Sequence, residues 1–151
     1  MDLVIPYWHP IVVHFPVALL PFGAVAAAVY AVTGRSLWRT VALLAFVAGA
    51  LGAWASVATG ETIYEEVEGT PVVETFVEQH ETYGEWALWT SVATVLLLVG
   101  AAGWNWRAER GAGARDPLTL RLVVLVFALA AAVLVALAGH LGGLMVWGVP
   151  P

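Results

Sequence analysis

Four histidines are the side chains best suited to chemistry in this sequence: His9, His14, His80 and His140. Neutral imidazole is the commonest protein ligand for metal ions, and it also binds haem iron. No cysteine is present, which excludes disulfides, iron–sulfur clusters and thiolate metal sites. A ligand site in this chain would therefore be built from imidazole, with carboxylate oxygens as the second available donor.

The segments that carry these histidines are long and apolar. Of the 151 residues, 61% are hydrophobic and 11% are charged, whereas a soluble domain carries about 25% charged residues. Apolar runs of ~18 residues or more are typical of membrane spans. The pattern predicts spans at residues 11–33, 38–59, 86–104 and 118–146. It predicts an all-α fold, an integral membrane antiparallel four-helix bundle that forms a single transmembrane domain over residues 1–151.

The segment 61–85, between the second and third expected spans, is acidic. Its Thr70-Pro71 pair is typical of a helix start, with threonine as N-cap and proline at the first helical position. A helix from Pro71 is therefore expected to continue into the third span. The residues before the first span have no basic region and no small-residue cleavage site follows them. We expect that span to be retained rather than removed as a signal peptide.

The arginines lie on one side of the predicted membrane. They fall in the two connections on that side or at the base of the last span: Arg35, Arg39, Arg107, Arg110, Arg115 and Arg121. The other side carries Asp2 and eight glutamates, with no arginine or lysine. Short loops rich in arginine stay in the cytoplasm. We therefore expect a multi-pass protein of the cytoplasmic (inner) membrane, with both termini and the acidic segment outside.

All four histidines then lie near the outer surface, at different depths. At a rise of ~1.5 Å per residue, His14 lies about one turn inside the first span, and His140 lies near the outer end of the last span. These depths are compatible with a ligand shared by His14 and His140. His80 can join them if its helix tilts inward. His9, which precedes Pro10, is expected at the surface.

Prolines and small residues predict how the first two spans pack. Pro16 and Pro21 are expected to kink the first span, because each removes a backbone donor. A histidine inside the membrane can bond a carbonyl that a proline leaves free, which is the structural alternative to a ligand role. Stripes of small residues predict close helix–helix contact. They are Gly23, Ala27 and Ala31 in the first span, and Ala45, Gly49, Gly52, Ala53 and Gly60 in the second.

Two kinds of ligand fit such a histidine site. A b-type haem (heme b) needs two histidines from facing helices, or one histidine and an open side. Its propionates would have to use Tyr83, Trp86, hydroxyls, backbone donors or water, because no arginine or lysine lies on that side. A copper, zinc or iron ion needs three or four ligands. The glutamates that could complete its shell are Glu61, Glu65, Glu81 and Glu85.

Three motifs resemble a known family. They are His9-Pro10-Ile11-Val12-Val13-His14-Phe15-Pro16, then His80 with Gly84, and finally Gly139-His140-Leu141-Gly142-Gly143. Together with Thr59-Gly60 they resemble an uncharacterised family of prokaryotic four-span membrane proteins, the domain of unknown function numbered 2231. Some relatives are joined to c-type cytochrome domains, so the resemblance implies haem binding and electron transfer. It makes His14, His80 and His140 the candidate haem ligands, with His9 a weaker one.

The expected function is electron transfer near the outer surface by a membrane b-type haem protein. Such a protein could act alone or as a subunit of a respiratory or photosynthetic complex. The acidic segment would attract a cationic partner such as a basic cytochrome c. The alternatives are a histidine-based copper, zinc or iron protein, and a non-catalytic accessory subunit of a larger membrane complex. No nucleophile–base motif, phosphate loop or nucleotide fingerprint indicates independent catalysis. The net charge of −5 disfavours nucleic-acid binding.

Overall fold

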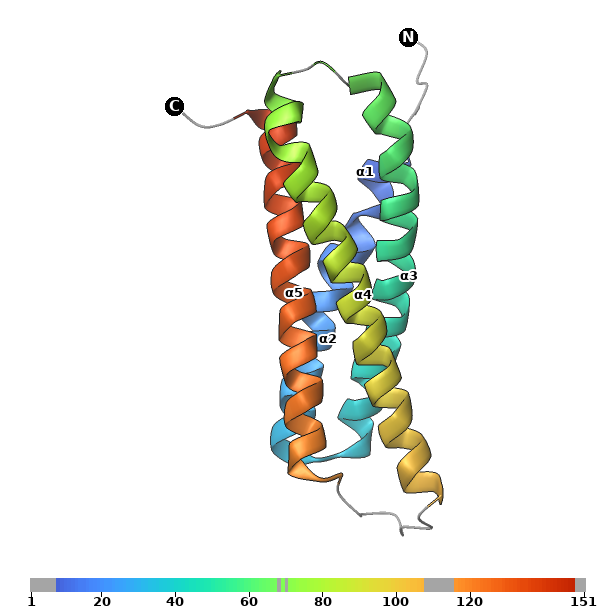
Figure 1. The fold of residues 1–151 in the computed structure, drawn as a ribbon. Coiled ribbons are helices and arrows are strands. Elements are labelled where there is room, and N and C mark those ends of the chain that lie inside the picture. The colour runs from blue at the N-terminus through green and yellow to red at the C-terminus, as the bar shows by residue number, and fades with distance from the viewer. Residues whose placement is uncertain (1–7, 68, 70, 108–115, 149–151) are drawn as a thin grey trace.

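The computed structural model describes residues 8–67, 69, 71–107 and 116–148, without the side chains of 62–67, 72 and 105–107. Its helices, in chain order, are α1 (His9–Val12), α2 (His14–Thr33), α3 (Ser36–Val67), α4 (Pro71–Arg107) and α5 (Leu118–Trp147). Figure 1 shows α2 to α5 running alternately up and down a single bundle. The all-α four-helix architecture predicted from the sequence is confirmed.

Each of the four long helices is apolar enough to cross a membrane. The apolar stretches are His9–Thr33, Ser36–Glu61, Val73–Trp104 and Leu118–Trp147. Within the most apolar 18-residue part of each stretch, only 28–33% of the residues are buried inside the bundle. Large apolar side chains therefore cover the outside, for example Val32 at 84% exposure and Leu96 at 66%. Such a surface is stable in a lipid bilayer and not in water.

The helices pack in a ring, in which each contacts its neighbours in the sequence and α5 closes the ring on α2. In Figure 1, α4 crosses the front of the bundle at a slant, with its upper half against α5. The upper end in Figure 1 is where α1 and α4 begin and α5 ends, and we call it the histidine end because these parts of the helices carry His9, His80 and His140. The lower end is where α2 leads into α3 and where α5 begins, and we call it the arginine end because these parts carry Arg35, Arg39 and Arg121.

Local chemistry explains where the first helices begin and end. The helix is interrupted at Val13, which separates α1 from α2 and places Pro16 in the first turn of α2. A proline is tolerated there, because first-turn N–H groups have no helical partner. The α2 helix continues through Pro21, so the kink that is predicted there does not end the helix. It ends at Gly34, whose φ of 64° is a left-handed cap that favours glycine.

Small residues allow α2 and α3 to approach closely, as the sequence predicts. A Cβ added to Gly49 would lie 2.5 Å from Leu20 Cδ2, and one added to Gly52 would lie 2.8 Å from Phe15 Cβ. Leu20 itself is fully buried. The rest of the core is rich in alanine and includes Ala24, Ala27, Ala42, Ala128 and Ala131. Close backbone approach of this kind is how helices associate in lipid.

The helices extend beyond the predicted spans at the histidine end. The α3 helix continues to Val67, and α4 begins at Pro71, so most of the acidic segment 61–85 is helical. The helix predicted from Pro71 into the third span is present as a single element of 37 residues. A helix satisfies its own backbone hydrogen bonds, so it does not have to end where the apolar residues end.

Candidate functional site

The structure brings His9 of α1 and His80 of α4 together at the histidine end. Their ring centroids are 6.2 Å apart, and the ring planes are inclined by 71°. Both side chains are half-buried. These two histidines come from opposite halves of the chain, so the packing of the bundle creates the pair.

His9 is held in place by α3. Its Nδ1 lies 2.9 Å from the carbonyl oxygen of Ser56 and 3.3 Å from Thr59 Oγ1. A carbonyl oxygen only accepts hydrogen bonds, so His9 Nδ1 carries the proton and donates it. The other ring nitrogen, Nε2, then keeps its lone pair and can act as a ligand.

His80 is held in the same manner by α5. Its Nδ1 lies 2.8 Å from the carbonyl oxygen of Ala138. The same reasoning makes Nδ1 the donor and leaves the lone pair on Nε2. Histidines that bind metals typically donate their second ring N–H to a backbone carbonyl or a carboxylate. Both members of the pair therefore have the hydrogen bonding of a ligand histidine.

His14 and His140 occupy different surroundings. His14 is exposed, and its Nδ1 donates to the carbonyl oxygen of Pro10 in α1, four residues earlier, at 2.6 Å. His140 is exposed on α5. Among the described residues, no hydrogen bond or ring contact joins these two side chains to each other or to the pair. The ligand shared by His14 and His140 that their depths suggested stays a prediction.

Three of the four glutamates proposed to complete a metal shell have described side chains, and these three form no group with the histidines. The side chains of Glu61, Glu81 and Glu85 are exposed, while that of Glu65 lies outside the described part of the chain. In the described ranges, no group of three or more histidine or acidic side chains is close enough to hold a metal ion. Two imidazoles are therefore the largest donor set that the described residues provide.

Two aromatic residues with polar atoms, Tyr83 and Trp86, follow His80 on α4. The rings of Tyr83 and Trp86 make an edge contact, with centroids 6.4 Å apart. The tyrosine O–H and the indole N–H are hydrogen-bond donors that suit the boundary between lipid and water. These are the two side chains that the sequence offered for haem propionates.

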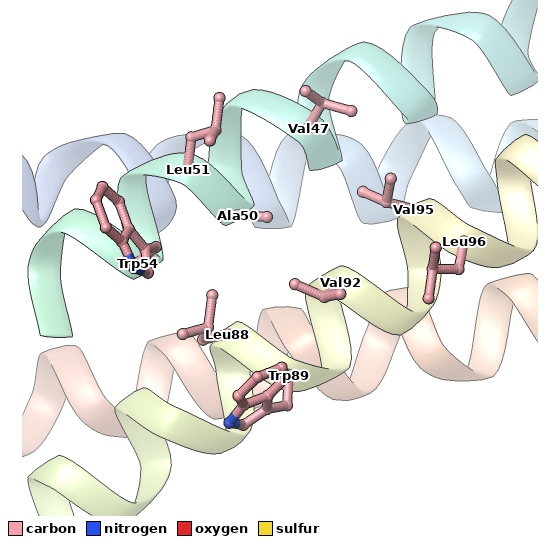
Figure 2. A pocket seen from close by; sticks show the side chains of 9 residues that line it. All are labelled: Val47, Ala50, Leu51, Trp54, Leu88, Trp89, Val92, Val95 and Leu96. Carbon is pink, nitrogen blue, oxygen red and sulfur yellow. The ribbon is translucent and has the colours of Figure 1, made fainter.

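A groove of about 490 Å³ lies between α3 and α4. Figure 2 shows side chains of both helices around it, among them Trp54 and Leu51 from α3 and Leu88, Trp89 and Val92 from α4. Every lining residue is apolar or presents an apolar surface. The groove can accommodate hydrocarbon, and it offers little to orient a polar ligand.

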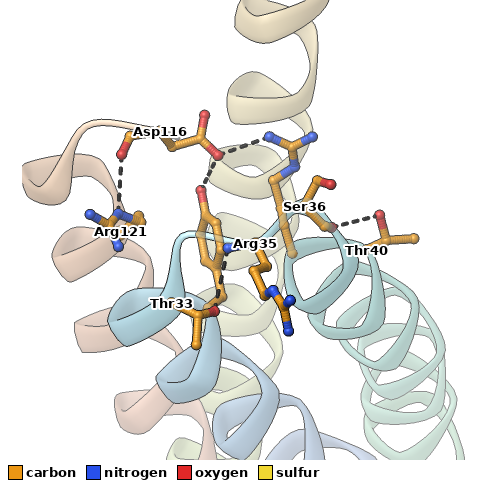
Figure 3. A network of polar contacts seen from close by, with 8 residues as sticks. Thr33, Arg35, Ser36, Thr40, Asp116 and Arg121 are labelled. Atoms are coloured by element: carbon orange, nitrogen blue, oxygen red, sulfur yellow. Dashed lines mark hydrogen bonds and ion pairs between the residues drawn. The ribbon is translucent and has the colours of Figure 1, made fainter. Parts of the chain in front are cut away.

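A second polar cluster, which the sequence analysis missed, lies at the arginine end. Asp116 is buried, and its carboxylate accepts hydrogen bonds from Tyr30 Oη at 2.5 Å and from Arg39 Nη1 at 2.8 Å. Arg121 donates to the backbone carbonyl of Asp116 at 3.1 Å and to that of Ala31 at 2.6 Å. Figure 3 shows the contacts of Asp116, which join α2, α3 and the start of α5.

This cluster gives a structural role to two of the arginines that the sequence analysis used only to predict the membrane orientation. Arg39 and Arg121 also hold the bundle together, which their positions at helix ends did not reveal. Arg35 is exposed, and its backbone N–H bonds Thr33 Oγ1. The side chain of Arg107, and all of Arg110 and Arg115, lie outside the described residues.

The fold and its polar ends define a class of protein: a four-span integral membrane protein with a histidine pair at one end of the bundle. A family model described as "Predicted membrane protein (DUF2231)" matches residues 6–149. The chain therefore belongs to this family, as its motifs indicated. No curated protein and no solved structure matched the chain.

Proposed function

We propose that the protein is a b-type haem protein of the inner membrane that passes electrons near the outer surface, and that His9 and His80 would hold the haem iron. The observation that carries the proposal is the pairing of the two rings at 6.2 Å, each with Nδ1 bonded to a backbone carbonyl. His14 and His140 are exposed, and within the described part of the chain no hydrogen bond links either of them to this pair.

The separation of the ring centroids, 6.2 Å, would allow both imidazoles to bind one metal ion. Metal–nitrogen bonds of about 2.0–2.1 Å, together with the size of the two rings, allow centroid separations of up to about 6 Å. Haem iron needs only two axial ligands from the protein, because the porphyrin supplies the other four. A bare zinc ion needs three or four protein ligands. The absence of a third donor within the described ranges therefore favours haem over a bare ion.

The protein would hold the haem and control its surroundings. Haem iron supplies one-electron redox chemistry when bound. His9 and His80 would hold and orient it, and the Nδ1 hydrogen bonds would make both imidazoles better donors. Tyr83 and Trp86, which follow His80 on α4, carry polar hydrogens that could bind the propionates.

The orientation and partners follow from the distribution of charge. Arg35, Arg39 and Arg121 at one end favour a cytoplasmic location for that end. The histidine end then faces outward, and its exposed glutamates, such as Glu78 and Glu81, would attract a cationic partner like a basic cytochrome c. The apolar outer faces would also allow the protein to act as a subunit of a larger respiratory or photosynthetic complex.

An oxidised-minus-reduced visible spectrum of the detergent-purified protein, with metal analysis of the same sample, tests this proposal. We expect a sharp reduced α-band typical of bis-imidazole haem and iron in stoichiometric amount. A colourless protein with stoichiometric copper or zinc would reject haem and support a metal-binding protein. A protein with neither ligand would reject both, and the accessory-subunit role would then be the better account.

A further inference from the structure

His9 and His80 are held by two half-sites with the same construction. In the first, His9 of α1 bonds the carbonyl of Ser56 on α3, and Gly60 lies one turn after that carbonyl. In the second, His80 of α4 bonds the carbonyl of Ala138 on α5, and a glycine, Gly142, again follows one turn later. Each half-site therefore combines a histidine, a helix carbonyl and a glycine four residues further along.

The glycine exposes the carbonyl to a second donor. In an α-helix the carbonyl of residue i already accepts the N–H of residue i+4. Side chains lean toward the N-terminus and cover the turn before their own Cα. A side chain at position 60 or 142 would therefore cover the carbonyl of Ser56 or Ala138. Glycine leaves that oxygen open, and the histidine N–H reaches it.

The imidazoles also lie directly against the two glycines. A Cβ added to Gly60 would lie 3.3 Å from His9 Cε1, and one added to Gly142 would lie 3.2 Å from His80 Cε1. Both distances are short for a carbon–carbon contact, so a methyl group would push the ring away from its carbonyl. By contrast, a Cβ on Gly143 or Gly84 would meet nothing within 4 Å.

We propose that Gly60 and Gly142 are positioning residues that fix His9 and His80 in the Nδ1–H tautomer and so keep Nε2 as the ligand atom. Because backbone carbonyls set the tautomer, the side chains at positions 56 and 138 are free to differ, as Ser56 and Ala138 do. Each helical hairpin supplies one ligand, so a bound ligand ties the two halves of the bundle together. Only the identity of that ligand, haem iron, rests on the function proposed above.

Nitrogen-15 NMR of histidine-labelled protein in detergent, without added ligand, measures the tautomers directly. The His80 signals are assigned by their loss in His80→Gln. We expect His80 in the Nδ1–H tautomer in the wild type and in Gly143→Ala, and a mixture of tautomers in Gly142→Ala. Haem titration of the same samples should show affinity reduced about tenfold in Gly142→Ala and unchanged in Gly143→Ala. For His9, Gly60→Ala is compared with Gly84→Ala in the same way.

The possible results separate this inference from the proposed function. The Nε2–H tautomer in the wild type, or glycine variants that behave like their controls, would overturn the half-sites even if haem binds. A different result is that the wild type shows the expected tautomers, Gly142→Ala loses them, and the wild type binds no haem. This result would reject the haem proposal and support the half-sites.

Discussion

Among the described residues, Asp116 is the one charged side chain buried in the bundle, and it contacts Tyr30 and Arg39. We expect Asp116→Asn to lower the free energy of unfolding by about 3 kcal/mol, because it leaves the partly buried guanidinium of Arg39 without its counter-charge. Thermal unfolding in detergent measures the loss. Arg35→Gln is the control, since Arg35 lies at the same end and is exposed. Equal stability of the two variants would contradict a structural role for the cluster.

Among the residues, the sequence predicted that histidines gather at one end of the bundle, but it did not predict that His9 and His80 contact each other. Counting the rise along ideal helices gives depth and suggested His14 with His140. The pairing of His9 with His80 depends on the slant of α4 and on the packing of α1 against α3, which are properties of the whole bundle. Depth alone also placed His9 at the surface, whereas its Nδ1 is bonded to Ser56 on α3.

Among the elements, the α2–α3 interface is the one most sensitive to added volume. A Cβ at Gly52 would lie 2.8 Å from Phe15 Cβ and 2.9 Å from Pro16 Cδ, and neither atom can rotate away. We expect Gly52→Ala to destabilise the protein by about 1–3 kcal/mol through overpacking. Gly100→Ala, with nothing within 4 Å, should leave stability unchanged or slightly raised. Thermal unfolding of both variants in the same detergent is the measurement. If Gly52→Ala unfolds at no lower temperature than Gly100→Ala, the close packing of α2 against α3 at Gly52 is contradicted.

The elements themselves were largely predictable. Apolar length identified all four spans, and small residues identified the face that α2 and α3 share. Hydropathy could not predict how far α3 and α4 continue beyond the apolar stretches, because a helix outside lipid is limited by capping and not by polarity. The missing backbone donor gave Pro16 and Pro21 equal weight, although Pro16 lies in the first turn of α2 and Pro21 lies inside the helix.

For the whole molecule, the charge distribution predicts one orientation. The chain contains no cysteine, so single cysteines can report it without background. We expect Glu78→Cys, at the histidine end, to react with a membrane-impermeant maleimide in spheroplasts. Ser36→Cys, exposed at the arginine end, should react only after the membrane is permeabilised. The reverse pattern would place the histidine pair in the cytoplasm and remove the case for an outer electron partner.

The proposed binding of haem by His9 and His80 together is tested by single-histidine variants. The measurement is the oxidised-minus-reduced spectrum of His9→Ala beside that of His140→Ala, each purified in folded form with wild-type helix content by circular dichroism. Because His140 is exposed and stands outside the pair, its variant should keep the α-band in full. His9→Ala should lose it or shift it to that of a haem with one histidine ligand. Retention of the band in His9→Ala, with its loss in His140→Ala, would contradict the account.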